Sequence, residues 1–306
     1  ELVKKNINAK RLYFDTDLKK SIKQADIIFI AVGTPSRRGD GHADLSFVFT
    51  AAKEIGRALD KYAVIVNKST VPIGTGKKVY DIIKKTNRNL KFDVASNPEF
   101  LREGSAINDF MRPDRVVIGC DSEKAKNLLR ELYRPLYLLE TPIIFTMRET
   151  AELIKYAANS FLATKITFIN EISDLCEKVG ANVNDVSIGI GLDGRIGKKF
   201  LHPGPGYGGS CFPKDTLALV KTAQDKKSPL KIIEHVVKSN DTRKKMIYKR
   251  VLKMLSKLKQ KNKVVSILGL TFKPNTDDMR DSPSLDIVPS LIKNNCKLRL
   301  YDPEGM

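Results

Sequence analysis

The first half of the chain alternates short apolar runs with segments of helical periodicity. Runs of strand length predict β-strands over residues 27–32, 64–66, 92–95, 116–118 and 143–145. Apolar residues recur at helical spacing over 45–59, 75–85 and 123–133, and Asp44 is the predicted N-cap of the first of these helices. Strands that are apolar throughout and alternate with helices are typical of a parallel sheet covered on both faces. The pattern predicts an α/β, Rossmann-like nucleotide-binding domain over residues 1–147.

The pattern changes at residue 148. One helical pattern runs over residues 148–179 and ends at Gly180, a typical residue for a helix C-terminus. Two more helices are predicted, over 215–223 and 229–258. The glycine-rich stretch 189–209, between the long helix and these two, is predicted to be a loop. Together these segments predict a central all-helical domain over 148–260, whose long helix suits either a connecting helix or a dimer interface.

A second α/β pattern begins after this region. A strand over 264–268, a helix over 284–293 and a strand over 298–301 predict the start of a second Rossmann-like domain, 261–306. The sequence has no GxGxxG turn, the usual opening of a dinucleotide-binding sheet. We therefore expect the chain to lack the first βαβ part of the NAD-binding domain and the C-terminal end of the second domain.

Charge and composition argue against a nucleic-acid partner and a membrane partner. The 54 Lys and Arg against 35 Asp and Glu give a net charge of +19, but the basic residues are scattered, and the densest stretch, 249–263, alternates with apolar residues. That alternation favours the solvated face of a helix over a nucleic-acid patch, so no nucleic-acid partner is expected. No apolar run approaches membrane-spanning length and no secretory leader is recognisable, so no membrane partner is expected.

The four cysteines lie far apart and form no CxxC pair. This spacing favours free thiols over a disulfide framework or a metal site, and free thiols are typical of a reducing compartment such as the cytoplasm.

Cys211 lies in the most distinctive segment, GGSCFPKD, at residues 208–215. Glycines let a backbone approach a ligand closely, and a cysteine just before a helix lies at the positive end of the helix dipole, which favours the thiolate. Lys214 adds positive charge, and Asp215 is a candidate base or water-orienting group. The alternative is a structural cysteine in a glycine-rich turn.

Four further segments carry candidate polar groups. Lys155 and Asn159 share one face of the long helix, either as a polar stripe or as groups that stabilise a developing alkoxide. Glu99 and Glu103 follow a strand, either as caps of the next helix or as acid–base and ribose-binding groups. The stretches 34–35 and 68–72 also follow strand ends, where parallel sheets hold ligands.

Eight motifs, in order along the chain, resemble the bacterial UDP-glucose 6-dehydrogenases of the UDP-glucose/GDP-mannose dehydrogenase family. They are VGTPS (32–36), NKSTVPIGTG (67–76), SNPEFLREGSA (96–106), PDRVVIG (113–119), ELIKYAANSFLA (152–163), GRIGKKF (194–200), GYGGSCFPKD (206–215) and LGLTFKPNTDDMR (268–280). The resemblance implies NAD-dependent, two-step oxidation of UDP-glucose to UDP-glucuronate. The alternatives within the family are UDP-N-acetylmannosamine and GDP-mannose dehydrogenases, and a catalytically incompetent fragment is a third possibility.

The resemblance also implies roles for individual residues. Cys211 resembles the nucleophile that forms a thiohemiacetal and then a thioester, while Thr70, Glu99 and Asp215 resemble groups that handle water and protons. Lys155 and Asn159 resemble the oxyanion-stabilising pair. The implied substrate contacts add Phe100, Leu101, Arg102, Glu103, Phe200, His202, Gly204, Gly206, Tyr207, Gly208, Phe272 and Lys273 to Glu99, Lys155 and Asn159, and Arg195 resembles an arginine that reaches into the partner subunit's site. The implied NAD contacts are Val32, Gly33, Thr34, Pro35, Ser69, Thr70, Glu103, Lys214 and Arg280. A homodimer or higher homo-oligomer through the central helical domain is also implied, and no metal site is expected.

Overall fold

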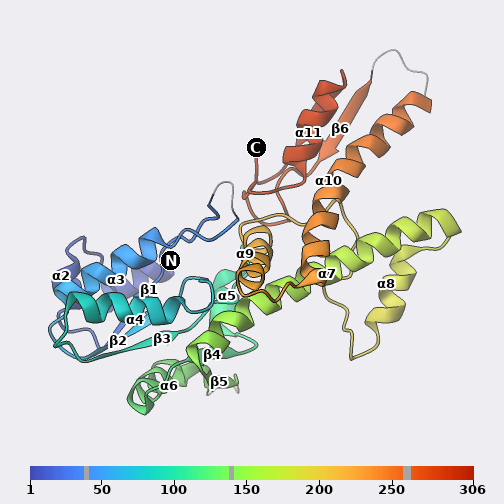
Figure 1. Ribbon diagram of the computed structural model, residues 1–306. Helices are drawn as coiled ribbons and strands as arrows, with labels where there is room; N and C mark the ends of the chain where they lie inside the picture. The colour runs from blue at the N-terminus through green and yellow to red at the C-terminus, as the bar shows by residue number, and fades with distance from the viewer. Residues whose placement is uncertain (38–40, 138–140, 258–262) are drawn as a thin grey trace. The chain divides into compact units, whose positions relative to one another are not determined.

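A computed structural model describes residues 1–37, 41–137, 141–257 and 263–306 (Figure 1). The chain divides into two compact units. The first comprises residues 1–34, 44–99 and 111–153, and the second comprises 35–43, 100–110 and 154–306. The boundary between the last segments falls inside the long helix α7 (Arg148–Val179), which has the bounds predicted from the sequence.

The first unit contains one five-stranded sheet in the order β1-β2-β3-β4-β5. Its strands are β1 (Ile27–Ile30), β2 (Ala63–Asn67), β3 (Phe92–Ser96), β4 (Val116–Gly119) and β5 (Ile143–Thr146). Its principal helices are α3 (Ser46–Ala58), α4 (Thr75–Thr86) and α6 (Glu123–Tyr137), and α1 (Leu2–Asn8) and α2 (Leu18–Ile22) precede the sheet. The α/β, Rossmann-like architecture is confirmed.

One strand pairing departs from the parallel arrangement that was predicted. β1, β2 and β3 are parallel, and β4 and β5 are parallel, but β3 and β4 pair in antiparallel fashion through Ser96 and Gly119. A parallel crossover needs a connection that packs back across the sheet, usually a helix of some length. Here the connection carries only the six-residue helix α5 (Ala106–Met111), and residues 100–110 belong to the second unit.

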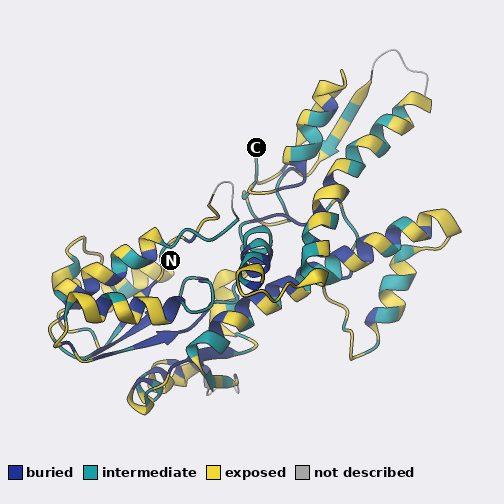
Figure 2. Cartoon of the chain, viewed as in Figure 1, coloured by how far each residue is buried: buried dark blue, intermediate teal, exposed yellow. Residues whose placement is uncertain are grey.

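Side chains of successive strand residues build a core on each face of this sheet. Ile65 packs with Val48, Ile55 and Val79 of α3 and α4, whereas Val64 belongs to a second cluster with residues of β4 and α6. All five residues of β2 are buried, in agreement with the uninterrupted apolar run in the sequence (Figure 2). Both faces of the sheet are therefore covered.

The second unit is built around α7 and three further helices, α8 (Val183–Gly191), α9 (Phe212–Asp225) and α10 (Lys231–Lys257). It also holds a parallel pair of strands, β6 (Val264–Leu268) and β7 (Lys297–Tyr301), joined through α11 (Ser284–Lys293). This pair is the predicted start of a second α/β element.

Two local predictions are corrected. The loop expected over 189–209 begins only after Gly191, because α8 continues through both Gly189 and Gly191. The N-cap of α3 is Leu45 rather than Asp44, although the Asp44 carboxylate still accepts a hydrogen bond from the Ser46 N–H at 2.9 Å. The predicted domain boundary at 260/261 and the helix end at Leu258 lie outside the described residues.

All four cysteines are free thiols. Within the described ranges, no helix is both long enough and apolar enough to cross a membrane, and no cluster of three metal-ligating side chains occurs.

Candidate active site

Cys211 is the N-cap residue of α9, and Pro213 lies in the first turn of the helix. Proline is favoured there because its missing N–H would have had no intrahelical partner. Cys211 is half-buried, and its Sγ lies 3.6 Å from the Ser210 Oγ. The thiol therefore lies at the end of α9 where the unpaired backbone N–H groups of the helix begin.

Asp215, one turn into α9, is almost fully buried and both of its carboxylate oxygens are engaged. Its Oδ2 accepts a hydrogen bond from Asn159 Nδ2 at 2.6 Å, and its Oδ1 forms an ion pair with Lys214 Nζ at 2.6 Å. Charge-assisted hydrogen bonds of this kind fix side-chain orientation. Asp215 therefore links Asn159 of α7 to the turn of α9 that carries Cys211.

Lys155 lies one turn before Asn159 on α7, and both side chains are buried. Its Nζ lies 5.3 Å from the centre of the Phe100 ring, within the range of a cation–π interaction. A buried ammonium and a buried amide on one helix face are suited to stabilising an oxyanion.

The backbone before Cys211 is tightly enclosed. Gly209 has a φ of +85°, and a Cβ there would lie 2.5 Å from the ring of Phe272. Its N–H donates to the Arg280 carbonyl at 2.7 Å. Only glycine fits both the conformation and the space, so residues 208–211 are held against the loop that precedes α11.

Glu103 is surrounded by charged residues of that same loop. Arg280 forms an ion pair with Glu103 Oε1 at 3.0 Å, and Lys273 Nζ donates to the Glu103 carbonyl at 2.8 Å. Ser210 Oγ lies 3.4 Å from Glu103 Oε1. Burial and the neighbouring Asp278 carboxylate raise the pKa of Glu103, although Arg280 and Lys273 act in the opposite direction. Glu103 is thus joined both to the predicted cofactor residue Arg280 and to the segment that carries the thiol.

Apart from Leu101 and Arg102, the remaining predicted substrate residues of the second unit lie along the connection from α8 to α9. Phe200 and Tyr207 each place their rings 6.1 Å from the ring of Phe212. His202 and Arg195 are exposed, and the Arg195 guanidinium forms an ion pair with Asp193 at 2.6 Å. Arg102 is paired with Asp109 at 2.6 Å.

In the first unit, the predicted cofactor residues meet at the carboxyl ends of β1 and β2. Thr34 Oγ1 donates to the Thr70 carbonyl at 2.9 Å, and Ser69 Oγ donates to the Val32 carbonyl at 2.6 Å. Gly33 between them is exposed, and Glu99 follows β3 in a half-buried position. Pro35 belongs to the second unit.

This edge of the sheet has the chemistry of a nucleotide site. Nucleotide cofactors bind outside the carboxyl ends of parallel strands, where small and polar residues let the backbone approach the ligand. Asn67, buried at the end of β2, has neither side-chain amide atom paired among the described residues, which leaves hydrogen-bonding capacity at this edge. The residues present therefore fit NAD, with Val32 to Thr34, Ser69 and Thr70 as its candidate contacts in the first unit.

Several buried polar residues were missed from the sequence. Glu152 accepts hydrogen bonds from the N–H groups of Gly74 and Gly76 at 2.6 and 2.8 Å, at the start of α4. Asn240 and Arg243 of α10 contact the backbone of the loop that leads to Cys211. The signal was present for the last two, because Asn240, Arg243 and Lys244 fall on one face of a predicted helix.

Family models of the UDP-glucose/GDP-mannose dehydrogenase family match three ranges: the NAD binding domain at 1–137, the central domain at 149–242 and the UDP binding domain at 266–306. A UDP-glucose 6-dehydrogenase of Rhizobium meliloti (strain 1021) is 59% identical over the whole chain, which covers 70% of that relative. The chain belongs to the UDP-glucose/GDP-mannose dehydrogenase family.

Solved structures of the family share the fold. A UDP-glucose dehydrogenase from Pyrobaculum islandicum aligns with a TM-score of 0.93 at 38% identity, over 99% of this chain and 70% of that one. A UDP-D-ManNAc dehydrogenase from Pyrococcus horikoshii aligns with a TM-score of 0.87 at 29% identity, over 98% of this chain and 70% of that one. The chain is therefore an oxidoreductase by family, with an NAD-binding domain, as the motifs predicted.

Proposed function

We propose that the protein oxidises C6 of UDP-glucose twice to give UDP-glucuronate. The observation that carries the proposal is the half-buried thiol of Cys211 at the start of α9, next to the Asn159–Asp215–Lys214 arrangement. The 59% identity to a UDP-glucose 6-dehydrogenase supports the choice of substrate. Overall, one UDP-glucose, two NAD⁺ and one water give one UDP-glucuronate, two NADH and three protons.

In this proposal Cys211 acts as the nucleophile. Bound NAD⁺ supplies the hydride acceptor for each oxidation. Between the oxidations, the Cys211 thiolate attacks the C6 aldehyde to form a thiohemiacetal, and Lys155 and Asn159 stabilise its oxyanion. After the second oxidation the sugar is bound as a thioester, which water cleaves to release the acid and the thiol. The covalent bond retains the reactive aldehyde on the enzyme throughout.

Asp215, Thr70 and Glu99 are proposed to handle water and protons. Both Asp215 oxygens are engaged, so its contribution in this arrangement is to orient Asn159 and Lys214. Thr70 and Glu99 belong to the first unit, where the Thr70 carbonyl accepts a hydrogen bond from the candidate cofactor residue Thr34. The other substrate and cofactor contacts implied by the resemblance remain part of this proposal.

We also propose a homodimer through the central helical region. Phe161, Phe168 and Leu175 recur every seven residues on α7 and are 65%, 50% and 54% exposed. A seven-residue repeat places them along one seam of the helix, and exposed apolar seams of this kind mark helix–helix interfaces.

The four free cysteines support a reducing compartment, and we place the protein in the cytoplasm.

A substrate panel tests the proposed reaction. The protein is incubated with NAD⁺ and, in turn, with UDP-glucose, UDP-N-acetylmannosamine and GDP-mannose, and NADH is followed at 340 nm, a wavelength at which only the reduced cofactor absorbs. We expect NADH with UDP-glucose and little with the other two sugars. Faster turnover of either alternative would reassign the substrate within the family.

A further inference from the structure

One face of α10 carries three buried polar side chains. Asn240, Arg243 and Lys244 are only 5%, 8% and 7% exposed, and their spacing places them on the same side of the helix. Buried polar groups are costly unless they are hydrogen-bonded, so their partners show what the face is for. All three reach backbone groups of loops in the second unit.

Asn240 clamps the backbone of Tyr207. Its Oδ1 accepts the Tyr207 N–H at 2.8 Å, and its Nδ2 donates to the Tyr207 carbonyl at 3.1 Å. The preceding Gly206 has a φ of +120°, and a Cβ on it would lie 2.9 Å from Asn240 Oδ1. One amide thus satisfies both backbone groups of a residue four positions before Cys211.

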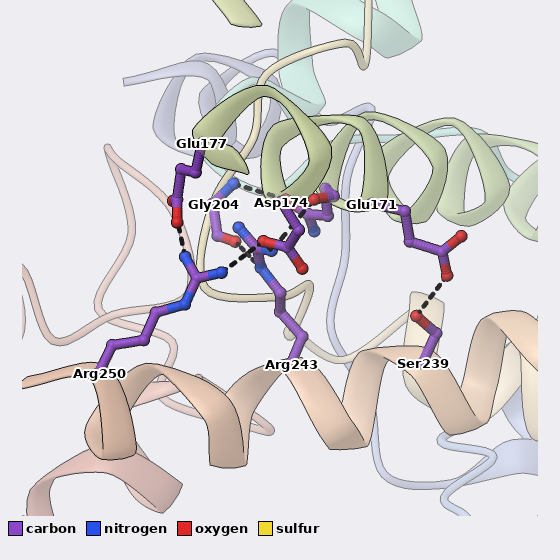
Figure 3. A network of polar contacts seen from close by, with 8 residues as sticks. Glu171, Asp174, Glu177, Gly204, Ser239, Arg243 and Arg250 are labelled. Carbon is purple, nitrogen blue, oxygen red and sulfur yellow. Dashed lines mark hydrogen bonds and ion pairs between the residues drawn. The ribbon is translucent and has the colours of Figure 1, made fainter. Parts of the chain in front are cut away.

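Arg243 holds the same loop at Gly204. Its Nε donates to the Gly204 carbonyl at 2.9 Å, and its Nη1 donates to the Asn170 carbonyl at 3.1 Å. The Gly204 N–H in turn donates to Asn170 Oδ1 at 2.8 Å. Arg243 is also paired with Asp174 of α7, and Figure 3 shows its guanidinium between Asp174 and Gly204.

Lys244 contacts the loop before α11, against which Gly208 and Gly209 pack. Its Nζ donates to the Asp281 carbonyl at 3.0 Å. That carbonyl oxygen lies 2.3 Å from where a Cβ of Gly208 would be. The next contact along the loop is the hydrogen bond from the Gly209 N–H to the Arg280 carbonyl.

We propose that Asn240 and Arg243 are positioning residues that set the path of residues 204–209 and thereby the position of the Cys211 thiol. Four glycines in this loop give its backbone many accessible conformations, so the path must be imposed from outside. The contacts are made to backbone atoms, which fixes the path of the chain whatever its side chains. The proposal rests on the proposed function of Cys211.

The chain offers a matched control. Arg250 lies two turns further along α10 and forms ion pairs with Asp174 and Glu177 of α7 at 2.7 and 2.8 Å (Figure 3). Within the part of the chain that the structure describes, it makes no hydrogen bond to the loop that leads to Cys211. Arg250→Lys therefore disturbs the packing of the same two helices without touching that loop.

The test is the alkylation rate of Cys211 by iodoacetamide without substrate, followed by mass spectrometry of its peptide. Cys120, Cys176 and Cys296 are buried away from the reagent, so these thiols react slowly. Burial also raises the pKa of Cys120 to about 11. Asn240→Ala and Arg243→Lys are compared with Arg250→Lys, and thermal unfolding is recorded for each. Should Asn240→Ala fail to fold, Asn240→Gln replaces it, because it keeps the amide and lengthens the reach.

We expect several-fold altered alkylation rates in the Asn240 and Arg243 variants and an unchanged rate in Arg250→Lys. kcat/KM for UDP-glucose should fall by about 10- to 100-fold in the first two, since misplacement by about 1 Å can cost 10²-fold. Unchanged Cys211 reactivity in variants that are folded would overturn the positioning role. The alkylation readout needs no turnover, so it separates failure of this inference from failure of the proposed reaction.

Discussion

At Cys211 and Asp215 the candidate chemistry is visible in the local sequence, whereas at Glu152 it depends on distant partners. Cys211 and Asp215 stand out because glycines, a proline and a lysine surround them, and the structure places Asp215 against Asn159. Glu152 carries no such signal, because its partners Gly74 and Gly76 lie in a segment nearly 80 positions away. Sequence periodicity cannot show which backbone N–H groups a buried carboxylate will meet.

Asp302 gives a prediction at this scale. It accepts hydrogen bonds from the N–H groups of Leu270, Thr271, Glu304 and Gly305, and these bonds hold its pKa below the ordinary value of 3.8. A lowered folded-state pKa stabilises the fold above that ordinary value, and the stabilisation is lost as the pH falls further. Asp302→Asn should therefore be less stable than wild type at pH 7.

The difference in the free energy of unfolding between wild type and Asp302→Asn should narrow as the pH falls below 3.8. Urea unfolding at a series of pH values measures this difference. Glu304→Gln, which alters an exposed neighbour, is the control and should change little. A deficit in Asp302→Asn that stays constant with pH would contradict this role of the carboxylate.

At the level of elements, the strands and the long helix followed from periodicity, whereas the direction of β4 did not. The apolar runs located every strand of the first unit, and α7 has its predicted bounds. Strand direction depends on where the connection goes, and the motif-rich segment 97–115 contains only the short helix α5. A run of apolar residues has no direction, so this difference could not be seen in the pattern.

Glu152 joins α7 to the start of α4. Burial raises its pKa, although Gly74, Gly76 and Ser96 donate to the carboxylate. A raised folded-state pKa means that its contribution to stability is greatest below its ordinary value of 4.5 and declines as the pH rises through the folded-state pKa. Glu152→Gln removes this pH dependence. It also replaces one accepting oxygen by a side-chain NH2 group, so one backbone N–H at the start of α4 loses its acceptor.

We expect Glu152→Gln to lower the free energy of unfolding by about 1–3 kcal/mol below pH 4.5, where the carboxyl group contributes most, and by less at neutral pH. Denaturant unfolding at a series of pH values measures this. Equal stabilities for Glu152→Gln and wild type would show that the carboxylate does not hold α4.

The turn before α9 gives a third prediction. Gly209→Ala forces a side chain into a φ of +85° and against the Phe272 ring, so either the ring or the turn has to move. We expect a loss of about 1–3 kcal/mol in stability together with reduced activity. Gly194→Ala is the control, because within the described residues no heavy atom lies within 4 Å of its Cβ position. Wild-type behaviour of Gly209→Ala would contradict the close packing at the turn.

For the whole molecule, the motifs identified the family and the reaction class, and three family domains match along the chain. The division into domains at 147/148 and 260/261 stays a prediction, and so does the assembly. Four of the basic residues behind the net charge of +19 can be assigned to the candidate site. They are Lys155, Lys214, Lys273 and Arg280, which contact other residues of that site. The remainder could not be assigned from composition.

The proposed dimer is tested at its exposed seam. Phe168→Lys places a charge in the middle of the α7 stripe and should convert a dimer to a monomer in light scattering after size-exclusion chromatography. Ile232→Lys, at a comparably exposed position on α10, should leave the dimer intact. A wild-type monomer, or a dimer that survives Phe168→Lys, would contradict an interface along this seam.

The most direct test of the proposed chemistry is the yield of NADH from a limiting amount of UDP-glucose, with the nucleotide product identified by mass spectrometry. The wild-type protein should form two NADH for each UDP-glucose and release UDP-glucuronate. Cys211→Ala should form no UDP-glucuronate, because the thioester cannot form. Formation of UDP-glucuronate by Cys211→Ala at the wild-type yield would contradict the role of Cys211 as the nucleophile.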